Sequence, residues 1–324
     1  MPRFLPSLTA AIAFGAAFPI ADSALKRIDP FHLTAIRYGL ATIAFLGLLW
    51  AIEGRRALHP GSRRRALELF GLGTAGFAGF NLLAYQGLTS STPQHAAVIA
   101  ALMPVMTVFG TWMISRVPPR PAILGFAVLA LAGAAMVISG GDPLRLVEGG
   151  LSGGDGLILL GAASFVGYTL GARRFADLSP LRYTALSATG GTVTILAVTE
   201  ALTFAGAEHT PTLADVGAVW WQLLYVVVAA AVIAVLAFNE GIRRLGPSGN
   251  ALWGNLIPIV AFAIAVGQGV TPGVGELAGT ALTIVALAGA NFAARARPAA
   301  QLSERPQRAA WAATRSANPA KSRA

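Results

Sequence analysis

Long apolar stretches recur along this chain from residue 5 to residue 293, and short segments rich in proline, glycine and arginine separate them. Each stretch has about 20 residues, the length that an α-helix needs to cross the hydrocarbon core of a bilayer. The alternating pattern of a transmembrane barrel is absent, and helices satisfy their own backbone groups within lipid. The sequence therefore predicts an all-α membrane protein with ten transmembrane helices: Leu5–Leu25, Phe31–Ile52, Ala66–Leu88, Gln94–Ile114, Pro121–Ser139, Gly154–Ala172, Leu181–Leu202, Val219–Glu240, Ser248–Gly267 and Gly275–Ala293.

The composition agrees with this pattern and excludes several kinds of site. Hydrophobic residues make up 55% of the 324 residues and charged residues only 12%, about half the charged share of an average soluble domain. The chain has no cysteine, which excludes disulfides, thiolate metal sites and cysteine catalysis. We therefore expect the membrane bundle itself to carry the function, without a separate soluble domain.

The basic residues are distributed unevenly among the loops. If the N-terminus is cytoplasmic, 20 of the 24 Lys and Arg residues lie on the cytoplasmic side, whereas Lys26, Arg27 and Arg145 lie outside and Arg37 lies within a span. This bias predicts a multi-pass protein of the cell inner membrane with both termini in the cytoplasm. Because the net charge of +10 is then topological, we expect a lipid bilayer rather than nucleic acid as the partner.

The two halves of the chain resemble each other. At a shift of 154 residues Ala84–Met106 falls on Phe238–Val260 without a gap. Further coincidences at shifts of 154 or 150 are Gly87 with Gly241, Pro93 with Pro247, Pro104 with Pro258, Pro30 with Pro180 and Thr34 with Thr184. We therefore predict five-helix repeats at residues 5–140 and 153–293, followed by a disordered basic cytoplasmic tail at 294–324. Since five is an odd number, the repeats are expected to be inverted, an arrangement that supports alternating access around a shared central site.

Several segments also resemble a known family. They are Phe14-Gly15-Ala16-Ala17-Phe18-Pro19, Arg37, and Tyr85-Gln86-Gly87-Leu88 followed by Ala101-Leu102-Met103-Pro104, a pattern that recurs in the second half and ends there at Pro258. In these segments the chain resembles the drug/metabolite transporter superfamily, specifically its ten-helix members with two EamA domains. The family often has Trp-Gly where this chain has Phe14-Gly15. The resemblance implies efflux or exchange of amino acids, other metabolites or drugs, and it leaves the substrate open.

Two prolines point to the expected central site. Pro104 and Pro258 stand within corresponding spans of the two halves, and each removes a backbone donor and frees a carbonyl one turn earlier. Paired helix breaks of this kind mark substrate sites in transporters, and we expect these two to act in gating. A kink that serves packing alone is the alternative.

The residues before Pro258 suggest a pocket for a small metabolite. An aromatic ring, Trp253, stands beside two amides, Asn250 and Asn255, and such a combination suits a ligand with both polar and apolar parts. Hydrogen bonding between helices would explain the same residues without a ligand. Further candidates for contact with the substrate are Asn81, Tyr85, Phe18 and Tyr168.

Arg37 is the unambiguous cation inside a span. A guanidinium facing lipid costs at least about 2.5 kcal/mol, so the side chain is expected to face the bundle. Two roles remain open: a structural pair, for which Asp22 is a plausible partner, and binding of a substrate carboxylate.

In the third span Gly71, Ala75 and Gly79 repeat every four residues, and we interpret this face as helix packing.

Other classes of function fit less well. The chain has no HExxH or Walker A motif, so a membrane-embedded enzyme and an ATP-driven pump are disfavoured. A scaffold would need a partner-binding domain, for which the sequence leaves no room. We expect a secondary transporter of small molecules that needs no cofactor or metal, with a homodimer as a further possibility.

Overall fold

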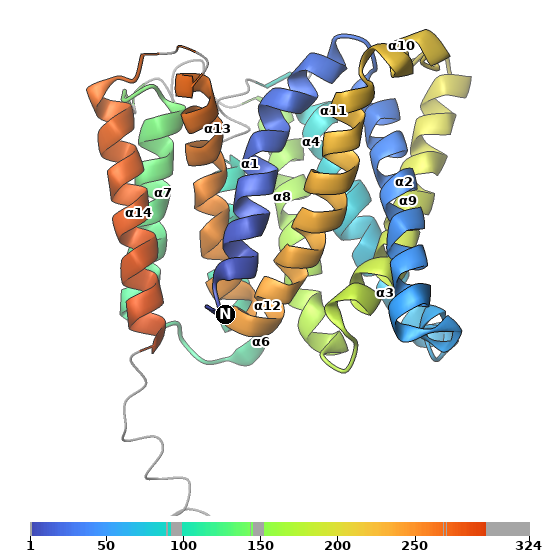
Figure 1. The fold of residues 1–324 in the computed structure, drawn as a ribbon. Coiled ribbons are helices and arrows are strands. Elements are labelled where there is room, and N and C mark those ends of the chain that lie inside the picture. Colours follow the sequence, from blue (N-terminus) through green and yellow to red (C-terminus); the bar gives the residue numbers. More distant parts are fainter. Residues whose placement is uncertain are drawn as a thin grey trace, which may run out of the picture.

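The computed structural model describes residues 2–88, 90–91, 99–142, 144, 152–267, 269 and 271–295. Every regular element within these ranges is a helix, which confirms the all-α prediction (Figure 1). Seven helical stretches are long and apolar enough to cross a membrane, and two shorter apolar helices cover Ile99–Ser115 and Val274–Ala290. Most of the predicted tail, from residue 296 onward, lies outside the described residues.

The first half of the chain forms helices close to the predicted spans. They are α1 (Leu5–Leu25), α2 (Pro30–Glu53), the short η1 (Arg55–Leu58), α3 (Arg63–Gly73), the π-helical η2 (Thr74–Gly79), α4 (Phe80–Leu88), α6 (Met103–Ser115) and α7 (Pro121–Ile138). The third predicted span is therefore a composite of three segments. A π-helical turn holds an extra residue, and such turns are frequent at functional sites.

The second half has a similar series. It contains α8 (Gly153–Gly171), η4 (Ala172–Phe175), α9 (Pro180–Phe204), the short α10 (Leu213–Ala218), α11 (Trp220–Leu224), the π-helical η5 (Tyr225–Ile233), α12 (Ala234–Ala251), the 3₁₀ turn η6 (Leu252–Asn255), α13 (Leu256–Gly267) and α14 (Val274–Arg295). The eighth predicted span is again composite. It ends where Gly246 adopts a φ of 75° before Pro247, a conformation that glycine tolerates and that breaks the helix.

Local sequence explains where α2 and α9 begin. The side chain of Asp29 accepts hydrogen bonds from the backbone amides of Phe31 and His32, and Pro30 occupies the first turn of α2. At α9 the side chain of Ser179 accepts from the amide of Arg182, and Pro180 occupies the first turn. A capping side chain followed by proline satisfies the free amides at a helix start and fixes its direction.

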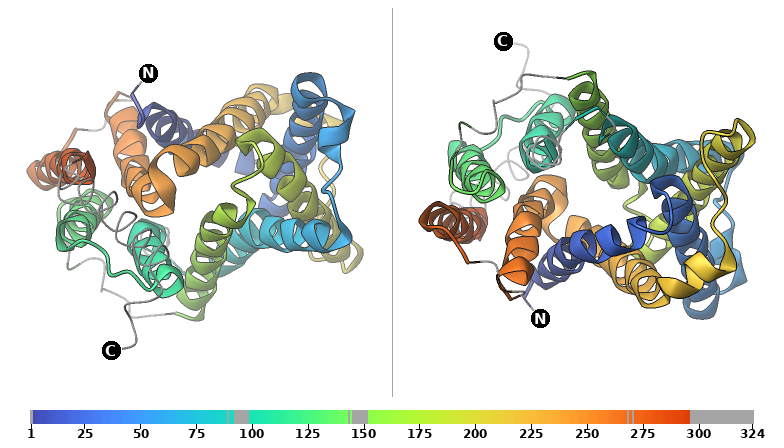
Figure 2. Two further views of the ribbon diagram at one scale, coloured as in Figure 1. Left: turned by 90° about the horizontal axis from the view of Figure 1, so that it is seen from below. Right: turned by 90° about the horizontal axis from the view of Figure 1, so that it is seen from above.

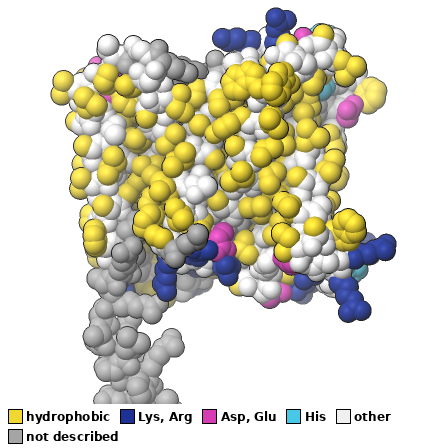
Figure 3. Space-filling view, viewed as in Figure 1, with side chains coloured by type: hydrophobic (Ala, Val, Ile, Leu, Met, Phe, Trp, Pro, Cys, Tyr) yellow, Lys and Arg dark blue, Asp and Glu magenta, His cyan; other side chains and the backbone are white. Residues whose placement is uncertain are grey.

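The helices form one elongated bundle with an apolar side surface. In Figure 1, α1 begins and α14 ends at the lower end, which also carries the turns at 54–62 and 116–120, and α8 runs in the direction opposite to α1. The end-on views show α7 and α14 side by side at one end of the outline (Figure 2). Apolar side chains cover the visible side, and charged side chains gather at its upper and lower edges (Figure 3), as expected for a protein that spans a bilayer.

Glycines allow the closest helix contacts, and the face predicted from Gly71 and Gly79 packs at Gly79, where a Cβ would lie 3.2 Å from the Cβ of Ser164, but not at Gly71. A Cβ atom on Gly73 would lie 1.7 Å from the carbonyl oxygen of Ser187 on α9, whereas one on Gly71 would have nothing within 4 Å. In this turn of α3, Gly73 and not Gly71 therefore lies on the face that contacts α9. Because the π-helical η2 follows directly, a spacing of four residues does not keep to one face along this helix.

Candidate functional site

Arg37 lies in the upper part of α2, half-buried inside the bundle. Its Nη2 donates to the backbone carbonyl of Ala230, at 3.2 Å, and its guanidinium carbon lies 5.0 Å from the centroid of the Tyr38 ring. Its Nε is buried without a hydrogen-bond partner. Among the described side chains no carboxylate forms an ion pair with it; the side chain of Asp22 lies outside that description. The charge is therefore only partly satisfied.

The partner carbonyl comes from the π-helical η5. Ala230 is buried within this run, where the wider turn changes the regular hydrogen-bond ladder of the helix. Such interruptions leave carbonyl groups available to side chains of neighbouring helices. The local irregularity of η5 thus explains how an arginine of α2 finds an acceptor within the apolar interior.

Aromatic side chains from four helices form a continuous cluster next to Arg37, which we call the aromatic cluster. Its members are Tyr38, Phe77, Tyr168 and Tyr183, and the successive ring centroids lie 5.3, 5.2 and 5.3 Å apart. Gly76 makes room for it, because a Cβ there would lie 2.4 Å from the ring of Tyr168. The cluster joins α2 and η2 of the first half to α8 and α9 of the second.

Amide side chains bond to the hydroxyl groups of this cluster. Nδ2 of Asn81 donates to the carbonyl of Phe77, at 2.7 Å, and reaches the hydroxyl of Tyr38, at 3.5 Å. Nδ2 of Asn239 donates to the hydroxyls of Tyr168 and Thr184, at 2.8 and 2.7 Å. Oδ1 of Asn239 is buried without a partner, so this amide retains an unused acceptor within the bundle.

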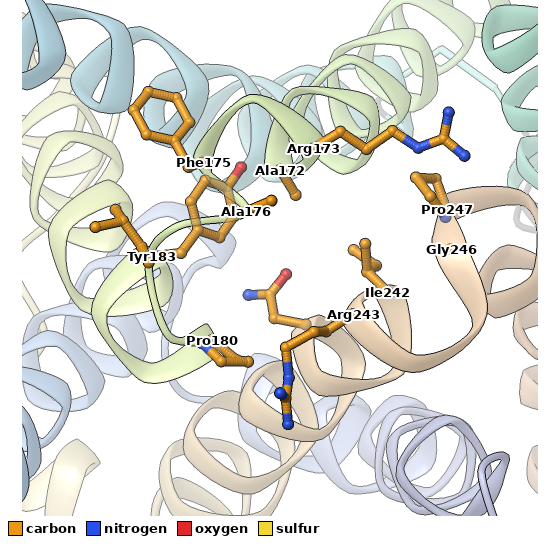
Figure 4. Close-up of a pocket in the computed structure, with 12 residues that line it drawn as sticks. Ala172, Arg173, Phe175, Ala176, Pro180, Tyr183, Ile242, Arg243, Gly246 and Pro247 are labelled. Atoms are coloured by element: carbon orange, nitrogen blue, oxygen red, sulfur yellow. The ribbon is translucent and has the colours of Figure 1, made fainter. Parts of the chain in front are cut away.

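A pocket opens beside Asn239 at the lower end of the bundle. It has a volume of ≈ 270 Å³, and Figure 4 shows it between η4, the start of α9 and the end of α12. Tyr183 of the aromatic cluster lines it, and Arg173 and Arg243 approach it from different sides. The pocket therefore leads from the lower surface to the aromatic cluster.

Comparison with known proteins identifies the family. The profile of the EamA-like transporter family matches residues 4–139 and again residues 152–292. The chain belongs to this family. It is a multi-pass membrane transporter.

Relatives of this EamA-like transporter support the assignment. It is 31% identical over 291 residues to the uncharacterized transporter YrdR of Bacillus subtilis (strain 168), a match that covers 87% of this chain and 89% of YrdR. It is 28% identical over 273 residues to the uncharacterized transporter YyaM of the same organism, covering 84% and 87%. A crystal structure described only as a protein has the same fold, with a TM-score of 0.72, 20% identity, and coverage of 90% of this chain and 97% of that one.

The three residues predicted before Pro258 lie in different surroundings in this EamA-like transporter. Oδ1 of Asn250 accepts a hydrogen bond of 2.6 Å from Ser7 of α1. The ring of Trp253 stacks on Phe4, with centroids 5.3 Å apart, and lines an apolar groove of ≈ 450 Å³ beside α14. The amide of Asn255 is fully buried, and neither of its polar atoms has a partner. Asn250 and Trp253 thus pack against the start of α1, and contact of Asn255 with a ligand stays a prediction.

The other predicted residues of the transporter divide into two sets. Asn81 and Tyr168 belong to the central group around the aromatic cluster. Phe18 lies in α1 and Tyr85 in α4, but their side chains lie outside the described part of the structure. Their contact with substrate stays a prediction.

Both prolines stand next to helix interruptions. Pro104 lies in the first turn of α6, directly after a turn at Leu102, and Pro258 is the third residue of α13, directly after η6. The breaks expected from the sequence are therefore present, and a role in gating remains a prediction.

The sequence interpretation missed Asn239 and Tyr183 as site residues. A shift of 154 places Asn239 opposite Tyr85, a signal that could have drawn attention to it.

Proposed function

We propose that this EamA-like transporter is a secondary transporter that exports or exchanges amino acids or related carboxylate-bearing metabolites across the inner membrane by alternating access. The observation that carries the proposal is Arg37, a half-buried guanidinium whose Nε has no partner and whose hydrogen bond goes to a neutral carbonyl. A cation held inside an apolar bundle attracts an anion, and a carboxylate is the group that a guanidinium binds in two-pronged geometry.

The surroundings of Arg37 suit the remainder of such a substrate. Tyr38 and the aromatic cluster offer apolar faces, and the amides of Asn81 and Asn239 offer donors and one unused acceptor. A few polar groups within an apolar lining are typical of sites for small molecules. Asn255 is a further proposed contact, and Phe18, Tyr85, Asn250 and Trp253 remain proposed members of the lining.

Contacts across the bundle support two inverted five-helix halves. Thr42 and Thr192 are separated by 150 residues, the shift that superposes α2 on α9, and their hydroxyl oxygens lie 2.8 Å apart. When two equivalent residues touch each other, a two-fold axis passes between them. The opposite directions of α1 and α8 in Figure 1 agree with an axis in the membrane plane.

Irregular segments repeat in the same way. The π-helical runs η2 and η5 occupy equivalent positions at a shift of 154, and η2 packs on α9 as η5 packs on α2. The stretch Trp220–Ile264 has 45 residues, about twice the length that one crossing needs, and Gly246 divides it. These features support ten crossings, with the arginine-rich lower end in the cytoplasm and the pocket at Tyr183 as the inward-facing entrance.

Counterflow into proteoliposomes tests this function. Vesicles loaded with a mixture of unlabelled amino acids should accumulate a labelled amino acid without ATP, and amine analogues that lack the carboxylate should not compete. The variant Arg37→Gln should lower transport roughly 10- to 150-fold at equal protein abundance, because losing a hydrogen bond to a charged group costs about 1.5–3 kcal/mol. The matched control Arg55→Gln, at an exposed turn, should behave as the parent.

Two results would count against the proposal. Unchanged transport and abundance in Arg37→Gln would remove the role of the guanidinium. A lack of counterflow for every carboxylate and every other metabolite tested, together with turnover of lipid or peptide, would favour a membrane-embedded enzyme instead.

A further inference from the structure

The side-chain amide of Asn239 on α12 is held in one orientation by its neighbours. Its Nδ2 lies 2.7 Å from Oγ1 of Thr184, and that hydroxyl oxygen lies 2.7 Å from the backbone carbonyl oxygen of Pro180. Because a carbonyl oxygen only accepts hydrogen bonds, the proton of Thr184 points to Pro180, and the oxygen of Thr184 is left as an acceptor. The amide atom that faces Thr184 is therefore the nitrogen.

The amide of Asn239 thus has an unused acceptor and no unused donor. The second proton of Nδ2 goes to the hydroxyl of Tyr168, at 2.8 Å. The residue is 4% exposed, and none of the described groups donates to its Oδ1. A buried polar atom without a hydrogen bond is unfavourable, so this oxygen suits a ligand group that donates.

Asn239 also lines the pocket of Figure 4, which we call the inner pocket. Its volume is ≈ 270 Å³, and the aromatic or apolar side chains of Tyr183, Phe175 and Ile242 form part of its wall. The ring of Tyr183 stacks on that of Tyr168, with centroids 5.3 Å apart. An ammonium group is attracted to aromatic faces and donates to an amide oxygen. The inner pocket therefore offers an amine the partners that it needs.

The two arginines at the rim of the inner pocket differ in their partners. Arg243 pairs with Glu240, at 2.6 Å, so its charge is offset. Figure 4 shows the side chain of Arg173 extending along the rim toward Pro247, and its Nη2 would lie 3.6 Å from a Cβ on Gly246. A guanidinium binds a carboxylate through paired hydrogen bonds. The rim and the interior thus complement the two charged groups of an amino acid.

The inner pocket is separate from the site around Arg37. Arg37 donates to the carbonyl of Ala230, which precedes Asn239 by nine residues within the helical stretch Trp220–Ile264. Nine residues of helix span roughly 13 Å at 1.5 Å per residue. The α-amino and α-carboxyl groups of an amino acid share one carbon atom and do not bridge such a length. Asn239 therefore belongs to a second position on the path through the bundle.

We propose that the inner pocket is a second binding site for the amino acid, in which Oδ1 of Asn239 accepts from the protonated amine and Arg173 binds the carboxylate. The inference rests on the proposed function for the substrate class and for the cytoplasmic side of the pocket, and it adds the requirement for an amine. Asn239 determines specificity there. A 2-oxo acid of the same carbon skeleton is disfavoured, because its keto oxygen meets an acceptor instead of a donor.

Protection of a single cysteine reports occupancy of the inner pocket without any transport. The chain has no cysteine, and Ala176 is exposed and lines the pocket, so Ala176→Cys should react with a maleimide. In lipid nanodiscs, leucine, isoleucine and phenylalanine, chosen for the apolar wall, should slow this reaction. Their 2-oxo acids should need at least about tenfold higher concentrations for equal protection, since they lack the charged donor to Asn239.

Variants of the cysteine-labelled protein separate the roles of the two ends of the ligand. Asn239→Leu removes the acceptor, so the ratio between the half-protecting concentrations of oxo acid and amino acid should fall towards one. Arg173→Gln should weaken protection by both kinds of ligand and keep the parent's ratio, because both carry the carboxylate.

A second variant on α9 covers a failure of Asn239→Leu to fold. Thr184→Val removes the hydroxyl that orients the amide and should also lower the ratio. The matched control is Thr189→Val, which removes a hydroxyl that bonds the carbonyl of Ala185 one turn earlier on the same helix. This control should keep the parent's ratio.

The inference is overturned if the amino acids give no protection, or if the oxo acids protect as well as or better than the amino acids. A ratio in Asn239→Leu or Thr184→Val that equals the parent's also overturns it. The role of Arg173 is overturned if Arg173→Gln leaves protection unchanged. Counterflow in Arg37→Gln tests the proposed function, and protection of the pocket is measured without transport, so the two failures are distinguishable.

Discussion

At the scale of single residues, the most informative atoms are buried polar atoms without a partner. They occur on Arg37, Asn239, Asn250 and Asn255, within or next to the helices that meet inside the bundle, and also on Arg182 and Gln222. A buried group left without a hydrogen bond costs about 1–3 kcal/mol, so such groups persist where a ligand or a second conformation satisfies them. Asn255 is the extreme case because both of its polar atoms are unpaired.

Two asparagines close together in the sequence are predicted to respond differently to substitution. Asn255→Ala removes an amide that has no partner, so the protein should keep its abundance and melting temperature while the apparent affinity for substrate changes. Asn250→Ala leaves Ser7 without its acceptor and should lower stability by about 1–3 kcal/mol. Thermal unfolding in detergent and uptake curves of both variants provide the check. Uptake by Asn255→Ala that matches the parent at every concentration would remove this residue from the site.

At this scale the sequence indicated which charged and amide residues lie within the bundle, but it did not indicate their hydrogen-bond partners. Arg37 was recognisable because a lone arginine stands out within an apolar span. Its acceptor on Ala230 was not, since that carbonyl is available only because η5 is irregular. Asn250 and Trp253 were expected to face a ligand, and both also serve packing against the start of α1.

At the scale of helices, local chemistry defines the ends and tertiary contacts define the irregular turns. Asp29-Pro30 and Ser179-Pro180 begin α2 and α9 as their capping chemistry predicts. The π-helical runs η2 and η5 carry no comparable signal, because they depend on how neighbouring helices pack. For that reason the packed face of the third span was assigned to Gly71 instead of Gly73.

A pair of glycine substitutions in α3 tests this reassignment. Gly73→Ala would place a methyl group 1.7 Å from the carbonyl oxygen of Ser187 and should destabilise the protein by about 1–3 kcal/mol or more, as overpacking does. Gly71→Ala has open space around it and should leave the melting temperature unchanged. Equal melting temperatures for the two variants would show that α3 and α9 are not in this contact.

At the scale of the whole molecule, the account depends on two halves that face each other across a two-fold axis. The mutual contact of Thr42 and Thr192 and the matching runs η2 and η5 agree with this arrangement. The repeat itself could be predicted from prolines and glycines at fixed shifts. The mutual contact of Thr42 and Thr192 could not, because it depends on how α2 packs on α9.

Labelling of two equivalent positions from the two sides of the membrane tests this arrangement most directly. Lys26 follows α1, Ala176 occupies the same place after α8 at a shift of 150, and both are exposed. In the cysteine-free chain, a cysteine at position 26 should react with a membrane-impermeant maleimide added to intact cells. A cysteine at position 176 should react only when the cytoplasmic side is opened. Reaction of both positions from the same side would contradict the inverted arrangement and, with it, the shared central site.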